Sequence, residues 1–255
     1  MGEGSSTIPI AVANGGTHPG GTDSKGSYSS LEEQLKELIK KVENDNWIID
    51  ICNSELSRDP NNYVALTFRG RAYNGNKKYD KSIPDLNRAI GIKPNYAPAY
   101  YGRGNYYMNG RKDYDRAIAD YNRAIELDPN NADAYDDRGA AYADGRKDYD
   151  RAIVDYDKAI ELDPNNASAY TNRGNAYFMK GDYYSAFDDY DKAIELDPNN
   201  ASAYTNRGNA YFMKGDYFSA IHDYNKALAI DPHFELARNN KKKAEDKLVE
   251  RYENK

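Results

Sequence analysis

The side chains that could perform acid–base or nucleophilic chemistry are few and scattered. The candidates are the single cysteine and the three histidines, Cys52, His18, His222 and His233. None of them stands in a Ser/His/Asp arrangement or at the spacing of a metal-ligand set. The adjacent acids Asp136 and Asp137 would point apart on a helix. We therefore predict that the protein is not an enzyme and that it holds no metal and no cofactor.

Arginine and aspartate recur in a more regular pattern. Five times along the chain an Asp follows an Arg by 16 or 17 residues. The pairs are Arg69 and Asp85, Arg103 and Asp120, Arg138 and Asp155, Arg173 and Asp189, and Arg207 and Asp223. A half-buried guanidinium needs a carboxylate or a carbonyl as partner. We hypothesise a repeated Arg–Asp bridge between paired helices, with independent solvated charges as the alternative.

The prolines show the period of the elements that must position these pairs. They recur at 34 or 35 residues, as Pro60, Pro94, Pro129, Pro164, Pro198 and Pro232. A fixed period in this range indicates a solenoid of stacked units. Within 167–200, two stretches with helical spacing of apolar residues are separated by KGDY and closed by DPNN, whose proline cannot continue a helix. Each unit is therefore predicted to be helix, turn, helix, turn.

The period divides the chain into four parts. Residues 1–28 are a Gly/Ser/Thr-rich leader that we predict to be disordered. Residues 29–62 form an N-terminal helical pair, which is either a degenerate repeat or a cap, and 235–255 form a C-terminal capping helix. Between them lie five units, at 63–96, 97–131, 132–166, 167–200 and 201–234.

Two local irregularities lead to further expectations. The units 97–131 and 132–166 hold one extra residue, which we place in the turn between their helices. Pro84 lies early in the second helix of the first unit. Because proline is tolerated only near the start of a helix, we expect this helix to begin late or to bend.

The repeated unit resembles the tetratricopeptide repeat. Small residues and rings at fixed offsets carry the resemblance, namely Gly70, Gly104, Gly139, Gly174 and Gly208; Tyr73, Tyr107, Tyr142, Tyr177 and Tyr211; and Ala89, Ala124, Ala159, Ala193 and Ala227. The resemblance covers about residues 63–234. It implies an all-α fold, a right-handed α-solenoid of helix-turn-helix units with helical caps. Most of the 25 tyrosines would then pack their rings between helices.

In this family, function usually lies on the concave face, which the first helices build. The resemblance puts on that face Tyr101, Asn105, Met108, Asp136, Thr171, Asn172, Asn175, Phe178, Met179, Thr205, Asn206, Asn209, Phe212 and Met213. The fourth-unit members recur unchanged in the fifth unit, 34 residues later, and we expect both sets to be exposed. Asn can bind a peptide backbone through donor and acceptor together, and Met and Phe adapt to apolar side chains.

We therefore predict a non-catalytic protein–protein interaction scaffold that binds an extended peptide or a partner helix in the concave groove. One alternative is an adaptor for a C-terminal tail, as in co-chaperone members of the family. The cations that such members use to hold the terminal carboxylate are missing here. At one of the repeat positions that carries such a cation, the first three units have Thr67, Tyr101 and Asp136. The other alternative is a self-assembling structural solenoid, because near-identical units present near-identical surfaces.

Composition sets the remaining expectations. The net charge of −6 and the pI of 5.2 argue against a nucleic-acid surface. No apolar run approaches the roughly 20 residues that span a bilayer. A single cysteine excludes an internal disulfide. We expect a cytoplasmic protein with a protein or peptide partner, without nucleic acid or a membrane span, for which self-association remains an open alternative.

Overall fold

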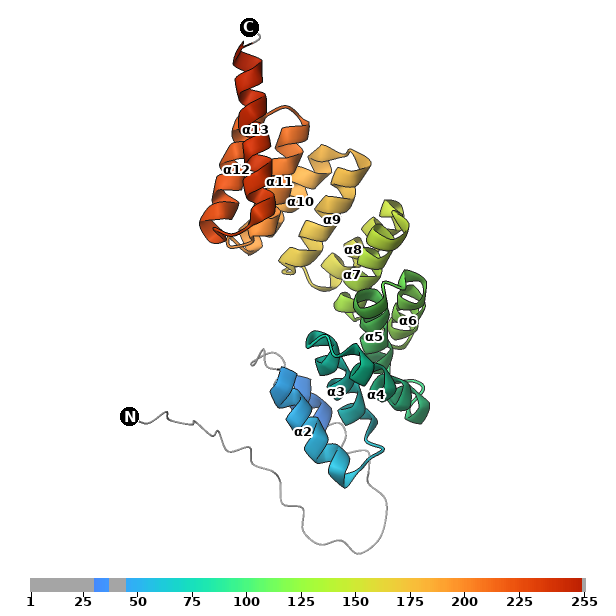
Figure 1. Ribbon diagram of the computed structural model, residues 1–255. Coiled ribbons are helices and arrows are strands. Elements are labelled where there is room, and N and C mark those ends of the chain that lie inside the picture. Colours follow the sequence, from blue (N-terminus) through green and yellow to red (C-terminus); the bar gives the residue numbers. More distant parts are fainter. Residues whose placement is uncertain (1–29, 37–44, 254–255) are drawn as a thin grey trace, which may run out of the picture.

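The computed structural model describes residues 30–36 and 45–253, and every regular element in them is a helix. The predicted leader and part of the predicted N-terminal pair lie outside the described residues. The helices stack one after another along a curved row from α2 to α13 (Figure 1). The predicted all-α solenoid is therefore confirmed.

A short helical segment at 30–36 precedes α2, and five helix pairs and a final helix follow. The bounds are α2 Asp45–Arg58, α3 Tyr63–Gly75, α4 Tyr79–Ile92, α5 Ala97–Asn105, η1 Tyr106–Arg111, α6 Tyr114–Leu127, α7 Ala132–Ala140, η2 Ala141–Arg146, α8 Tyr149–Leu162, α9 Ala167–Lys180, α10 Tyr183–Leu196, α11 Ala201–Met213, α12 Tyr217–Ile230 and α13 Glu235–Glu253. We call α3, α5 with η1, α7 with η2, α9 and α11 the first helices of their units.

Short polar side chains begin most of the helices. In DPNN the last Asn is the N-cap of the next first helix, as in Asn166, whose Oδ1 accepts from the Ala169 amide over 3.1 Å. In KGDY the Asp is the N-cap of the second helix, as in Asp182, which accepts from the Ser185 amide over 3.2 Å. These bonds satisfy amides that have no partner within the helix. The two recurring motifs therefore mark both helix starts of a unit.

The helices of a unit approach closely where a glycine meets a ring. A Cβ on Gly104 would lie 2.5 Å from the Tyr121 ring, and the Tyr121 side chain is fully buried. The same contact recurs between Gly208 and Tyr224, where the Cβ would lie 2.7 Å from the ring. Only glycine fits at such a distance. The predicted packing of these rings between helices is confirmed.

The hypothesised Arg–Asp bridge is present in all five units. In each unit Nε and Nη2 of the arginine donate to the two carboxylate oxygens of the aspartate over 2.5–2.9 Å. Nη1 donates to the preceding helix pair, with Asn53, Asn87, Asn122, Asp157 and Asp191 as the successive acceptors. Each arginine thus joins the two helices of its unit to the helix that directly precedes the unit.

The extra residue of two units lies in the first helix, so its predicted place in the turn is wrong. Helices α5 and α7 continue as the π-helical turns η1 and η2, which end at Lys112 and Lys147. These lysines have left-handed φ values of 53° and 55°, where Gly181 of the fourth unit has 81°. A π turn takes up an inserted residue without ending the helix. The turn that follows can therefore keep its course.

Pro84 does not delay the helix that contains it. Helix α4 begins at Tyr79, the same place in its unit as Tyr183 of α10, and Pro84 lies inside it. The expected late start is therefore wrong. The missing N–H of Pro84 removes the bond to the carbonyl of Asp80, which is an exposed residue where water can replace it.

Candidate functional site

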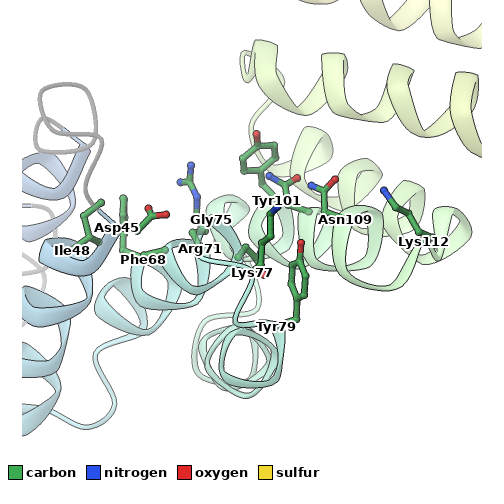
Figure 2. A pocket seen from close by; sticks show the side chains of 13 residues that line it. Asp45, Ile48, Phe68, Arg71, Gly75, Lys77, Tyr79, Tyr101, Asn109 and Lys112 are labelled. Atoms are coloured by element: carbon green, nitrogen blue, oxygen red, sulfur yellow. The ribbon is translucent and has the colours of Figure 1, made fainter. Parts of the chain in front are cut away.

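Three cavities follow one another along the first helices. The N-terminal cavity, of about 720 Å³, is lined by residues of α2, α3, α4, α5 and η1 and of the turns beside them (Figure 2). The middle cavity, of about 210 Å³, lies among α7, η2, α8 and α9. The C-terminal cavity, of about 200 Å³, lies among α9, α11, α12 and α13. The face that holds them is called the first-helix face below.

Asn175 lines the middle cavity and is held by two neighbours. Its Oδ1 accepts from the Tyr190 hydroxyl over 2.8 Å and from Asn206 Nδ2 over 2.9 Å. Asn206 belongs to the next unit, so the contact also links two first helices. Within the described chain, no protein group accepts from Asn175 Nδ2. The side chain therefore offers amide donors to a ligand and no free acceptor.

The arrangement recurs one unit later. Asn209 lines the C-terminal cavity, and its Oδ1 accepts from the Tyr224 hydroxyl over 2.8 Å and from Asn240 Nδ2 over 2.9 Å. Asn240 lies on α13, so the final helix continues the row of polar contacts. Among the described residues, Asn209 Nδ2 likewise has no acceptor.

Apolar side chains lie beside both asparagines. Met179 lines the middle cavity and Met213 the C-terminal cavity, and each is 57% exposed. Phe178 and Phe212 line the C-terminal cavity and are half-buried. The Phe178 ring meets the Tyr183 ring at 5.6 Å, in an edge contact that holds it in place. Asn, Phe and Met of the predicted set therefore do come together.

Thr171 and Thr205 do not belong to this surface. Both are buried, and their hydroxyls donate to the carbonyls of Ala167 and Ala201 over 2.9 and 2.8 Å. The expectation that they are exposed is wrong. Each hydroxyl bonds the backbone of its own helix instead of water.

Two adjacent acids join three units. Asp137 accepts from the Tyr101 hydroxyl of the preceding unit over 2.8 Å, and Asp136 accepts from Asn172 Nδ2 of the following unit over 3.2 Å. The acids therefore point apart, as predicted. Burial raises the pKa of Asp136, and burial with the neighbouring acids raises the pKa of Asp137 to about 6, against the Tyr101 hydrogen bond, which lowers it.

The second unit places its residues differently from the prediction at one position. Asn105 lines the N-terminal cavity, and its Oδ1 accepts from the Tyr121 hydroxyl over 2.7 Å. Met108 is buried against Ile118 and belongs to the core, so its predicted place on the binding face is wrong. Asn109 lines the cavity instead. Both residues lie in η1, whose wider turn changes the direction of each side chain.

The prediction missed the wall of the N-terminal cavity that α3 supplies. Arg71 lines this cavity at the place in its helix that Asn175 and Asn209 occupy in theirs. Three of the other four units have asparagine at this position, so an arginine there was a signal that could have been read from the repeat. Lys77 and Lys112 line the same cavity.

Two further findings concern classes of function. Within residues 30–36 and 45–253, no three side chains of His, Cys, Asp or Glu are grouped so that they could hold a metal ion. None of the helices in these ranges combines the length and the apolar character that crossing a membrane requires.

Comparison with known proteins agrees with the fold. Models described as TPR repeat match residues 111–144, 146–181 and 174–215, and models described as tetratricopeptide repeat match 63–96 and 201–234. Similar solved structures include MamA, with 27% identity over 64% of this chain and 94% of that chain and a TM-score of 0.57. Another is YrrB, described as a TPR protein with an unusual peptide-binding site, with 22% identity, 75% and 97% coverage and a TM-score of 0.59.

The type IV pilus biogenesis factor PilW is also similar, with 16% identity, coverage of 84% of this chain and 97% of that chain, and a TM-score of 0.72. At such identity, the likeness to YrrB and PilW concerns the fold alone. The family models, the period of the sequence and the stacked helix pairs agree with one another. The chain is therefore a member of the tetratricopeptide repeat family.

Proposed function

We propose that the protein is a non-catalytic interaction scaffold whose first-helix face binds an extended peptide. The observation that carries the proposal is a repeated pair of groups, Asn175 with Met179 and Asn209 with Met213, each lining a cavity. A peptide carbonyl can accept from the free amide, and an apolar side chain can pack on the exposed thioether. Because the pair recurs one unit later, it suits a ligand that runs along the array.

The region between the cavities adds a charge preference. Asp136 and Asp137 lie on the first helix of the third unit, which precedes the two Asn–Met pairs. Negative charge there favours a polar or cationic segment in the ligand. The proposed ligand is therefore a peptide whose apolar and carbonyl contacts lie toward the C-terminal end of the array.

A clamp for a terminal carboxylate has less support. The positions that would carry one of its cations include Thr67, Thr171 and Thr205, which are buried. The hydroxyl of Thr67, like those of the other two, donates to a backbone carbonyl of its own helix, over 2.8 Å. A desolvated carboxylate would find no partner charge at these positions.

Selection from a random peptide library tests the proposal. Displayed peptides of about 12 residues, which reach about 40 Å when extended, are selected on the full chain. The double variant Met179→Lys/Met213→Lys should bind the selected peptides about tenfold more weakly. The two substitutions together remove apolar contacts that contribute about 1.4 kcal/mol to binding. Both methionines are 57% exposed, so folding should be preserved.

The matched control is Val154→Lys/Phe218→Lys, which adds the same charges at exposed apolar residues outside the three cavities. Fluorescence anisotropy of labelled peptides gives the affinities. The proposal fails if no peptide is enriched, or if the two double variants bind the selected peptides equally well.

A further inference from the structure

The N-terminal cavity differs in charge from the rest of the protein. Its charged residues are the three cations Arg71, Lys77 and Lys112 and the single acid Asp45, a local charge of +2 in a chain of net charge −6. Figure 2 shows Arg71 projecting from α3 between Asp45 and Tyr101, with Lys112 on the far side of Asn109. With a volume of about 720 Å³, it is larger than the two cavities that contain the asparagines.

Arg71 is unlike the other arginines, all of which lie in the described part of the chain. Each of the others has an oxygen partner within 3.4 Å. No described residue accepts a hydrogen bond from Arg71 or forms an ion pair with it, and the Asp137 carboxylate acts on it only as a more distant charge. A guanidinium has five N–H donors, so this group keeps its full capacity for an external acceptor.

Two rings hold the free guanidinium in place. Its central carbon lies 5.5 Å from the centre of the Phe68 ring and 5.3 Å from the centre of the Tyr101 ring. Tyr101 is itself fixed, because its hydroxyl donates to Asp137 over 2.8 Å. Stacking on aromatic faces orients the fork of N–H groups while leaving its edge free. Less conformational freedom is then lost when an anion binds.

The two lysines add charge without being used by the fold. Neither the Lys77 nor the Lys112 ammonium group has an ion pair or hydrogen bond with a described residue. Both residues are exposed. Their left-handed backbone, with φ values of 56° and 53°, ends the two helices beside the cavity. They can therefore attract an anion over several ångströms while Arg71 makes the directed contact.

We infer that the N-terminal cavity binds an anionic side chain of the peptide partner through the Arg71 fork, with Lys77 and Lys112 as supporting charges. This inference rests on the proposed peptide-binding function. The same anion would be repelled at Asp136 and Asp137 of the third unit. The charges would therefore fix which end of the peptide lies at the N-terminal cavity and which lies toward α13.

The test uses the peptides selected on the full chain. The enriched sequences should carry Glu or Asp at one shared position. Changing that residue to Gln should weaken binding to the unaltered protein about tenfold, which is the low end for charge-assisted hydrogen bonds. The same change should weaken binding to the Arg71→Gln variant less than about twofold, because the partner charge is already gone.

Further variants keep the test independent of one substitution. Arg71→Lys retains the charge without the fork and should fall between the unaltered protein and Arg71→Gln. The pair Lys77→Gln/Lys112→Gln changes only exposed side chains and should weaken the acidic peptide while reducing the salt dependence of its binding. Arg123→Gln is the matched control, since Arg123 also lies over a ring, at 6.0 Å from the centre of Tyr100, but outside the cavity.

Replacing the shared acid by phosphoserine distinguishes the source of the anion. Tighter binding would assign a phosphorylated partner, and equal or weaker binding would assign a carboxylate. The inference is overturned if the enriched peptides share no acid, or if the Glu→Gln penalty is the same with and without Arg71. If no peptide is enriched at all, both the proposed peptide-binding function and this inference are overturned.

Discussion

Asn175 and Asn209 have a structural role that precedes any binding role. Each accepts hydrogen bonds from a buried tyrosine and from an asparagine of the next helix layer. An Asn→Ala change would leave two donors without an acceptor, and a loss of binding would then have two causes. Met179 and Met213 lack such contacts, so they report on the surface more directly.

Asp137 should make the stability of the protein depend on pH. Its pKa is raised to about 6 by burial and by the neighbouring acids, so the folded state holds a proton more tightly than the unfolded state. Protonation of Asp137 therefore stabilises the folded state. This stabilisation is absent well above pH 6 and grows as the pH falls through 6 toward 3.8, the ordinary pKa of an aspartate. Between pH 7.5 and 5, the free energy of unfolding of the unaltered protein should rise by about 1 kcal/mol relative to Asp137→Asn.

Urea denaturation of both proteins at the two pH values measures this difference, and other titrating groups cancel in it. Tyr101→Phe provides a second check. The Tyr101 hydroxyl donates to the charged Asp137 carboxylate and so lowers the pKa of Asp137. Without this hydroxyl, the rise in the free energy of unfolding should occur at higher pH. A stability difference that does not change with pH would contradict the assignment.

At the scale of the helix, the five units end their first helices with two chemistries. The fourth and fifth units use Gly181 and Gly215 in the left-handed conformation, and the first three units use Lys77, Lys112 and Lys147. A side chain raises the energy of this conformation by about 1 kcal/mol relative to glycine. In the second and third units, the lysine follows a π turn, so the helix end is strained while the register of the next helix is kept.

Exchanges at these helix ends should have opposite signs. Lys147→Gly should stabilise the protein by about 0.5 kcal/mol, because the relief of backbone strain exceeds the added freedom of the unfolded chain. Gly181→Ala should destabilise it by about 1 kcal/mol. Apart from its two neighbours in the chain, no described residue has a heavy atom within 4 Å of a Cβ at Gly181, so the effect would come from the backbone conformation. Thermal unfolding measures both, and shifts of the same sign would refute the explanation.

At the scale of the whole molecule, the Arg–Asp bridges form a continuous series through the array. Each arginine reaches the aspartate of its own unit and a side chain of the unit before it. In a solenoid, stability is the sum of the units and of the interfaces between neighbours. A charge pair that contributes to both terms therefore affects how many units unfold together.

A double-mutant cycle at the centre of the array should show this coupling. Arg138→Ala should reduce the free energy of unfolding by about 2–4 kcal/mol, because it leaves the buried Asp155 carboxylate unpaired. Adding Asp155→Ala should recover about 1–2 kcal/mol of that loss. Arg123→Ala, which breaks an exposed pair with Glu126, should change stability by less than about 0.5 kcal/mol.

Hydrogen exchange provides the whole-molecule readout of the same variants. In Arg138→Ala, the amides on the two sides of the interface between α6 and α7 should lose protection to different extents, because the coupling between the two parts of the array is weakened. Uniform loss of protection along the chain, or a cycle in which the two substitutions are additive, would contradict a linking role for the bridge.

The period, the helix pairs, the helix starts and the Arg–Asp bridges could be read from the sequence. They depend on contacts within one unit or between neighbours, and the repetition presents each contact five times, as in the pairing of Arg173 with Asp189. The same repetition identifies the rings that pack against glycine. A local rule that recurs at a fixed offset is visible without coordinates.

Other features depended on how the helices are rotated against each other. Thr171 and Asn172 are adjacent in sequence, yet one is buried and the other reaches Asp136. The inserted residue became a π turn, which buries Met108 and turns Asn109 to the cavity. The free state of Arg71 is also a tertiary property, because it results from which acceptors the neighbouring helices bring within reach. A change of rotation by part of a turn exchanges core and surface, and only the packing of whole helices determines it.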